Sequence, residues 1–549
     1  MKQYLLLSLL LITVFCKAQL VTTGKIEKLK DAWGESFTYT GEIKNKQPNG
    51  MGVAIYSNDY VLYYAGSFLN GQYNGKGVLL YKDGSFLSGN WKNGKQDGPG
   101  AHLNKSGDLF VGGFLDGKKE GSAKYVYGNN GILVGNMKAD EYDGRCIYIP
   151  SDFKTLNDNI YVAGKKNGSG YQYEFGSKKL FEGTWKNGEW QSSGTASYNS
   201  FLKHPKFIAE KTDAHLLMAV TNSKNLLDDT SFAYDYSLKK RYFGRYNDGF
   251  IKSGIIVRDD STRFIGNINT DGAYGQACLL KVGKYFDEGT YEKDFLTGPN
   301  SLSINIEKKT VYQGAASNGG EFTGKAFFVN ASGVIYYGDY KKGLFTGQGY
   351  KIGTDGICIK GTWDDGSLQT LTSLTSATGE NINLKPASLS DALTNAIKFY
   401  NNYFSAIEGK ENYDLDWEDV DVAYSSNYHF PGSTGDYIFD DYDYSTYYLA
   451  TYTSTTDFTK AKAKYDELCK QVKAAKLNLQ KGVAPVLLEG SIESATEGAE
   501  KTISKFAVPS SISGYSTMQL GVGIMQKDDG YYEVFIIIGD DFGYFFEED

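Results

Sequence analysis

The residues that could do chemistry are few and scattered along the chain. The four histidines lie far apart and show no metal-ligand spacing; they are His102, His204, His215 and His429. No HExxH, CxxC, GxSxG or phosphate-loop pattern occurs. A histidine in such a position is most often a surface or hydrogen-bonded residue. The sequence therefore predicts no catalytic residue and no cofactor, and we expect a non-enzymatic protein.

Two acidic clusters in the last third of the chain are the best remaining candidates for a site. Asp414 and Asp416 belong to the first, and Asp440, Asp441 and Asp443 to the second. Carboxylates are hard oxygen ligands suited to calcium, but neither cluster has the mid-loop glycine of an EF-hand. A solvated acidic loop is the favoured interpretation. A calcium site or a hydrolytic carboxylate pair remains as an alternative.

The first eighteen residues, MKQYLLLSLLLITVFCKA, have the pattern of a secretion signal. A basic residue, Lys2, precedes an apolar run that is too short to span a bilayer comfortably. Small residues at Cys16 and Ala18 indicate cleavage between Ala18 and Gln19. A lipid anchor on Cys16 is the rival interpretation, although Phe15 stands where such anchors require a small residue. We expect an exported protein, whether periplasmic, on the cell surface or secreted.

The elements that must position any site are repeats. A glycine recurs about every 22 to 25 residues, and its positions are Gly41, Gly66, Gly89, Gly112, Gly135, Gly164, Gly183, Gly244, Gly266, Gly289, Gly314, Gly338 and Gly361. Aromatic or aliphatic residues stand two before and two after it, as Tyr64 and Phe68 do around Gly66. Residues four apart on a strand share a face. Each copy therefore predicts a strand with one aromatic face.

A turn follows each of these strands. Asn70-Gly71 and Asp116-Gly117 are dipeptides that tolerate positive φ at both central positions, as a two-residue type I′ hairpin requires. A second strand then opens with Gly-x-Gly, as at Gly75 and Gly77. Each copy is therefore a hairpin, and a period in this range is typical of stacked repeats.

The pattern resembles the MORN repeat, most closely in Tyr64–Gly77 and Tyr337–Gly349. The resemblance spans Ser36 to Gly366, about three fifths of the chain. It implies a mainly β fold in which stacked hairpins form one elongated antiparallel single sheet. A smaller α+β domain is predicted after the repeats. MORN arrays serve as scaffolds for protein contacts, and some are linked to membrane lipids.

The pattern changes divide the chain into segments. A first block of repeats covers 36–195 and a second covers 243–366. Between them, 196–242 is predicted as decayed copies or as an insertion, with helix-like spacing in Pro205–Val220. A Ser/Thr/Asn-rich stretch, 367–386, is predicted as a linker.

Residues 387–549 are predicted to form an α+β domain of no recognised family. Helical spacing is found in Ser388–Ile407 and from Asp457 to about Leu479, with a capping box at Ser388 and Asp391. Strands are predicted at Thr446–Tyr452, Thr502–Val508, Met518–Gln526 and Tyr531–Gly539.

Charge divides along the same boundary. Ser36–Gly366 has 39 Lys and Arg against 34 Asp and Glu, whereas Ser367–Asp549 has 13 against 28. Binding of nucleic acid needs a positive surface, so such a partner is not expected. The small positive excess of the repeats also gives weak attraction to anionic lipid, and we rank a protein partner above a membrane. The oligomeric state has no signal in the sequence.

The aromatic face of the repeats has two interpretations. The aromatic residues either cover the sheet or form an exposed strip that binds a partner, because a single sheet cannot bury both of its faces. The candidate binding residues are Tyr64, Phe68, Trp91, Phe114, Trp185, Tyr340 and Trp363. Three cysteines, Cys146, Cys278 and Cys358, lie several copies apart and are expected to be free unless the array doubles back.

Overall fold

The structure is a computed structural model. It describes residues 22–540 apart from 153, 175, 176, 178, 196–206, 212–214, 222–226, 248, 249, 270, 271, 318–320, 401–403, 413–421, 441–445, 481 and 482. The signal-peptide residues Ala18 and Gln19, with Cys16, lie outside this part of the chain.

The first half of the repeats forms one antiparallel sheet in which nearly every strand pairs with its neighbours in sequence. Its strands are β1 Thr22–Lys30, β2 Ser36–Lys44, β3 Gln47–Tyr56, β4 Val61–Leu69, β5 Gln72–Tyr81, β6 Phe86–Lys92, β7 Lys95–Leu103, β8 Leu109–Leu115, β9 Lys118–Val126, β10 Ile132–Lys138, β11 Glu141–Tyr142, β12 Gly144–Ile149, β13 Thr155–Val162, β14 Lys165–Glu174, β15 Lys179–Lys186 and β16 Glu189–Thr195.

The second half forms another sheet with the same neighbour-to-neighbour order. Its strands are β17 Phe207–Lys211, β18 His215–Thr221, β19 Leu227–Asp235, β20 Lys240–Asn247, β21 Phe250–Arg258, β22 Thr262–Asn269, β23 Gly272–Lys281, β24 Tyr285–Glu292, β25 Phe295–Asn305, β26 Thr310–Ala316, β27 Phe322–Val329, β28 Ile335–Lys341, β29 Leu344–Ile352, β30 Cys358–Asp364, β31 Ser367–Thr375 and β32 Asn381–Ile382.

The predicted turns have the predicted geometry. Asn70 and Gly71 have φ of 49° and 85°, and Asp116 and Gly117 have 50° and 84°. Positive φ at both central positions matches the right-handed twist of the flanking strands, so the hairpin closes in two residues. The prediction of stacked hairpins is therefore confirmed.

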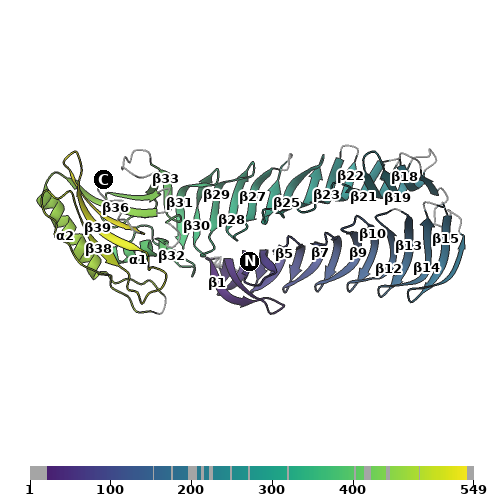
Figure 1. The fold of residues 1–549 in the computed structure, drawn as a ribbon, viewed down its shortest axis with the longest axis horizontal. Helices are drawn as coiled ribbons and strands as arrows, with labels where there is room; N and C mark the ends of the chain where they lie inside the picture. The colour runs from purple at the N-terminus through teal and green to yellow at the C-terminus, as the bar shows by residue number, and fades with distance from the viewer. Residues whose placement is uncertain are drawn as a thin grey trace, which may run out of the picture.

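The two sheets pack against each other and run in opposite directions along the molecule (Figure 1). Aliphatic side chains such as Val78, Leu80, Ile255 and Leu280 form one core between them. The hydrogen bonds between the sheets pair residues near the two ends of the repeat region and, further along the molecule, residues progressively nearer to its middle. The Tyr350 hydroxyl donates to Glu42 at 3.0 Å, the Tyr63 hydroxyl to the Lys309 carbonyl at 2.9 Å, and Arg263 to the Val126 carbonyl at 3.2 Å. The array thus doubles back between β16 and β17.

Three expectations are corrected by this arrangement. The array is two sheets rather than one, because the inner faces carry aliphatic side chains that only a second sheet covers. The described residues of 196–242 lie in β17, β18, β19, the turn 236–239 and the start of β20, and none of them is helical, so the helix-like spacing in Pro205–Val220 was misleading. The expected linker 367–386 contains β31 and β32, which extend the second sheet past the last repeat glycine.

The C-terminal domain is an antiparallel sheet with two helices on one face. Its sheet has the order β33-β34-β35-β36-β40-β39-β38-β37, and helix α2 packs on β36, β39 and β40 while helix α1 packs on β40. The elements are α1 Leu389–Tyr400, β33 Glu408–Glu411, β34 Val422–Ser426, β35 Gly435–Asp440, β36 Thr446–Thr455, α2 Phe458–Ala474, β37 Glu489–Gly490, β38 Lys501–Ala507, β39 Gln519–Gln526 and β40 Tyr532–Gly539.

The four predicted strands are confirmed within a few residues, and both predicted helices begin as expected but end early, at Tyr400 and Ala474; strands β33, β34, β35 and β37 were not predicted. Caps explain why the helices begin where they do. Ser388 and Asp391 form the capping box, since the Asp391 amide donates to Ser388 Oγ at 3.1 Å. Asp457 caps α2 by accepting from the Lys460 amide at 3.1 Å. None of the described helices has both the length and the apolar character that crossing a bilayer requires.

The described cysteines are buried and free, although the array doubles back. Cys278 and Cys358 lie in the core between the sheets. Burial raises the pKa of the Cys278 thiol far above its ordinary value, so it acts as a small apolar side chain.

Candidate interaction surfaces

Each repeat buries its aromatic side chains against one another on the outer face of its sheet. The Tyr64 ring meets Phe68 edge-to-face at 5.2 Å and stacks on Tyr73 at 3.7 Å between centroids, and Trp91 from the next copy closes the cluster at 5.4 Å from Tyr64. The rings lie over the glycines, since a side chain at Gly77 would collide with the Tyr64 ring. Glycine is therefore required where the ring approaches the backbone.

The polar atoms of these rings find backbone partners nearby. The Tyr64 hydroxyl donates to the Ser67 carbonyl at 3.1 Å, and the same bond recurs from Tyr312 to Ala315 at 2.6 Å. The Trp91 indole N–H donates to the Gly77 carbonyl at 3.0 Å. Buried tyrosine and tryptophan normally pair their polar atoms in this way. The aromatic residues are therefore structural parts of the repeat.

The prediction of an exposed aromatic strip is wrong for most of the candidate residues. Six of them are between 0% and 7% exposed, namely Tyr64, Phe68, Trp91, Phe114, Tyr340 and Trp363. Trp185 is half-buried, with the Lys166 ammonium 4.3 Å from its ring centroid. In the first sheet consecutive copies bring the rings close enough to cover one another, whereas Tyr340 and Trp363 belong to a core that continues into the C-terminal domain.

The exposed apolar side chains of the repeats lie instead on the inner faces, beside the tight turns. Leu69, Leu115, Phe295 and Leu344 are each about half exposed. Each is next in sequence to a residue of the outer face, such as Phe68 beside Leu69, so alternation along the strand directs it toward the other sheet. Exposure of an inner-face side chain means that the sheets are apart at this edge.

The sheets make several hydrogen bonds toward their opposite edge, and Glu42, close to a tight turn, makes one more with Tyr350; the exposed inner-face side chains mark the more open edge. At the opposite edge the Lys309 ammonium reaches the Lys82 carbonyl, and Arg263 reaches the Gly107 carbonyl. We call the open side the turn-edge groove. Its exposed apolar residues are Leu69, Leu115, Ile160 and Val162 on the first sheet and Tyr274, Phe295 and Leu344 on the second.

The floor of the turn-edge groove is polar. A cavity of about 310 Å³ lies between the sheets and is lined by Lys76 and Asn90 on one side and by Gln276, Glu288 and Thr290 on the other. The Gln276 amide donates to Thr290 Oγ1 at 2.7 Å. Burial raises the pKa of Glu288, while Lys76 opposes this shift. The space between the sheets thus offers hydrogen-bonding groups.

Sequence reasoning missed this groove, although a signal was present. The residue directly before the turn is an exposed leucine in some copies, Leu69 and Leu115, and lysine in others, Lys92 and Lys138. Because lysine occupies this position in other copies, the leucine is not needed there for packing. It is therefore a candidate contact residue.

Of the predicted acidic residues, the structure describes Asp440 alone. Asp440 ends β35 and accepts a hydrogen bond from Thr446 Oγ1 at 2.6 Å. Asp414, Asp416, Asp441 and Asp443 lie outside the described residues. Among the residues that are described, no group of three or more His, Cys, Asp and Glu side chains is arranged to hold a metal ion.

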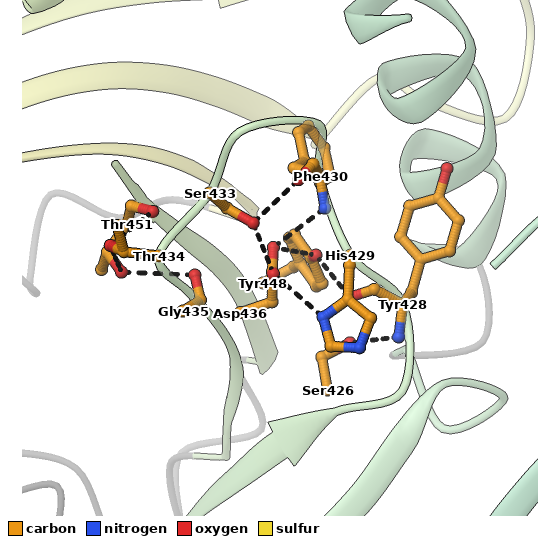
Figure 2. Close-up of polar contacts among 10 residues, drawn as sticks. All are labelled: Ser426, Tyr428, His429, Phe430, Ser433, Thr434, Gly435, Asp436, Tyr448 and Thr451. Atoms are coloured by element: carbon orange, nitrogen blue, oxygen red, sulfur yellow. Dashed lines mark hydrogen bonds and ion pairs between the residues drawn. The ribbon is translucent and has the colours of Figure 1, made fainter. Parts of the chain in front are cut away.

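A buried carboxylate, Asp436, organises a polar cluster in the C-terminal domain (Figure 2). Asp436 Oδ1 accepts from the Phe430 amide at 3.1 Å and lies 2.8 Å from the Tyr448 hydroxyl. Its Oδ2 accepts from Ser433 Oγ at 2.6 Å and lies 3.2 Å from His429 Nδ1. Sequence analysis did not single out Asp436, because its partners come from a loop and from strand β36.

The cluster has the parts of a histidine–carboxylate pair but not the arrangement of a nucleophilic triad. Ser433 donates to Asp436 and not to His429, so the histidine does not activate the serine. Burial, with Asp436 beside it, raises the pKa of Tyr448 well above its ordinary value, which keeps its hydroxyl protonated. These contacts fix the loop between β34 and β35 onto the sheet.

Comparison with known proteins identifies the repeats. The family model described as "MORN repeat" matches residues 39–59, 64–86, 88–108, 110–132, 181–200 and 336–358. These six segments are MORN repeats. The segments 64–86 and 336–358 include the two copies in which the sequence pattern is most complete. The MORN repeats thus occupy both sheets, most of them in the first.

Other comparisons give less. No curated protein matches the chain. Among solved structures, that of apo AztD from Citrobacter koseri has 10% sequence identity and a TM-score of 0.12, over 56% of this chain and 94% of that chain.

Proposed function

We propose that the protein is an exported, non-enzymatic scaffold that binds a protein partner in the turn-edge groove. The observation that supports this most directly is the row of exposed apolar side chains on the inner faces of the MORN sheets. Leu69 and Leu115 on one sheet and Phe295 and Leu344 on the other are about half exposed where the fold does not need them. Exposed apolar residues gathered on one surface are typical of protein contacts.

The groove suits an extended polypeptide with acidic residues. Its rim provides apolar contacts at the spacing of the repeats, and its floor offers side-chain amides and hydroxyls, among them Asn90 and Gln276. Exposed lysines stand in the same turns of the first sheet, including Lys92, Lys118 and Lys138. Complementary charge would speed association and orient the partner.

The test is a pull-down with the mature chain from the cell that exports it, followed by cross-linking of the captured protein. Leu69→Asp and Leu115→Asp should each reduce capture at least tenfold. Tyr60→Asp is the matched control, because Tyr60 is also about half exposed but precedes β4 at the opposite edge. A partner that is lost equally from all three variants, or from none, would contradict the proposal.

Export and the choice of protein over lipid are tested separately. Export requires that the mature chain from the cell begin at Gln19, which N-terminal mass spectrometry measures. A lipid-binding role would make the chain float with vesicles of anionic phospholipid at physiological salt. In that event the groove variants would leave flotation unchanged, and the ranking of protein above membrane would be reversed.

A further inference from the structure

Two copies of the repeat, one in each sheet, align position for position without a gap, from Gly66 and Gly266 to Trp91 and Tyr291. Around Gly66, the first has Tyr64 two residues before the glycine, and around Gly266 the second has Phe264. The ring that closes each cluster is Trp91 in the first and Tyr291 in the second. Two aromatic side chains are missing from the second copy, because Ile268 stands where the first has Phe68, and Ala273 where it has Tyr73.

In the first copy the Tyr73 ring fills the centre of the aromatic face. It stacks on Tyr64 at 3.7 Å and lies 5.4 Å from Phe68 and 5.6 Å from Trp91, between centroids. Tyr73 is only 2% exposed. Removing this ring while keeping its neighbours must leave a hollow, since the strands hold the neighbouring side chains in place.

The second copy has that hollow. A cavity of about 560 Å³ opens on the outer face of β21–β24, and its apolar walls include Phe264, Ile268, Ala273, Leu279 and Tyr291. The Phe264 and Tyr291 rings meet edge-to-face at 6.2 Å between centroids. A ligand ring can therefore stack on the face of Phe264, as Tyr73 stacks on Tyr64 in the first copy. The volume lies within the range of small-molecule sites, about 300–1,000 Å³.

Charged groups line this cavity, and positive ones predominate at the end where β21 and β23 finish, with Arg258, Lys281 and Lys284 against Asp260. Asp260 accepts from the Lys281 ammonium at 2.7 Å, whereas Asp294 accepts from the neutral Ala273 amide at 2.6 Å at the opposite end of β23. Arg258 and Lys284 also line the cavity, and both are exposed. Within the described residues neither forms an ion pair. An anionic group at this end would gain two charged donors.

We propose that this cavity binds a small aromatic carboxylate. Its ring takes the position that the Tyr73 ring has in the first copy, stacked on Phe264 and against Tyr291. Its carboxylate accepts hydrogen bonds from Arg258, with Lys284 adding attraction. The repeat thus recognises a free ring where the first copy supplies its own in Tyr73. The site is on the outer face and is separate from the turn-edge groove.

Titration calorimetry on the full mature chain, with 3-phenylpropionate as probe, tests the site. We expect saturable binding that weakens at least tenfold with the neutral amide of the same compound. Arg258→Gln should weaken binding of the carboxylate at least tenfold and leave binding of the amide unchanged. Lys325→Gln, which removes an exposed charge from β27 outside the cavity, is the control and should bind as wild type.

A second variant tests the place of the ring. Ala273→Tyr rebuilds the aromatic cluster of the first copy, so it should abolish binding while leaving the melting temperature equal or higher. Absence of heat with the wild-type chain would overturn the proposal, and so would unchanged binding by Ala273→Tyr. If Ala273→Tyr fails to fold, Arg258→Gln decides: unchanged binding of the carboxylate by this variant would refute the proposal. Equal binding of acid and amide by the wild-type chain would refute it as well.

Discussion

The rings of Phe86 and Phe286 lie 4.8 Å apart between centroids, although one belongs to the first sheet and the other to the second. Both are fully buried. Their contact is the clearest sign that the two arrays of hairpins are one folded unit. A single sheet of repeats would leave both rings in water. The second sheet packs on the inner face of the first and therefore supplies the core that a single repeat lacks.

Phe86→Ala should lower the free energy of unfolding by about 3–5 kcal/mol, because it removes a buried ring and leaves a cavity between two sheets. Chemical denaturation followed by circular dichroism measures this. The double variant with Phe286→Ala should cost less than the sum of the single variants, since the two rings contact each other. Strict additivity would mean that the sheets do not pack as described.

Trp91 should act on stability and not on binding. Trp91→Phe removes the indole N–H that donates to the Gly77 carbonyl, and we expect a loss of about 1 kcal/mol. Trp91→Ala should cost about 3–5 kcal/mol. Leu115→Ala, at an exposed position, should stay within about 0.5 kcal/mol of wild type. Equal effects of Trp91→Ala and Leu115→Ala would contradict the burial of the aromatic face.

His102 should destabilise the fold as the pH falls. Burial, with the Lys119 ammonium as the second cause, lowers the pKa of His102 to about 4. The unfolded chain takes up this proton near pH 6.5 and the folded chain does not, so stability declines as the pH drops from about 6.5 to about 4. His102→Gln should remove this decline. Denaturant midpoints for both proteins at pH 7 and pH 4.5 measure the difference, and parallel changes in the two would refute the assignment.

Asp287 should have the opposite slope in almost the same interval. Burial raises its pKa to about 6, and a hydrogen bond from Ser303 only partly opposes the shift. The folded chain then binds a proton that the unfolded chain releases above about pH 4, so this group makes the fold less stable as the pH rises from about 4 to about 6. Asp287→Asn should be more stable than wild type at pH 7. A variant that is less stable at pH 7 and equal at pH 4 would show that the carboxylate is favoured in its charged form.

The sequence allowed the hairpins to be predicted because each has a local cause. Asn70-Gly71 specifies the turn, and Gly77 provides the space that the Tyr64 ring needs. The pairing of the sheets has no such local cause. Val78 and Ile255 look like ordinary strand residues, and only the fold shows that they share a core.

The candidate surfaces were predicted less well for a related reason. Aromatic residues such as Trp91 attract attention by their type, but their exposure depends on neighbours in other copies. The groove residues, of which Leu69 is typical, are common in sequence and become informative only when their burial is known. The cavity beside Ala273 is the exception, since comparison of two copies by position would have found the missing ring in the sequence.

Asp436 should be the residue whose loss most disturbs the C-terminal domain without removing a large side chain. Its carboxylate joins the Phe430 amide, Ser433 and Tyr448, so Asp436→Asn replaces acceptors with a donor inside a buried cluster. We expect a loss of about 3–5 kcal/mol and faster proteolysis of the 427–434 loop, both measured on the full chain. His429→Gln is the matched control, because His429 is about half exposed and contributes one contact, so its cost should stay below about 1 kcal/mol. If the two variants were equally stable, the cluster would not anchor the loop, and a role for the His429–Asp436 pair in chemistry would become the better explanation of its geometry.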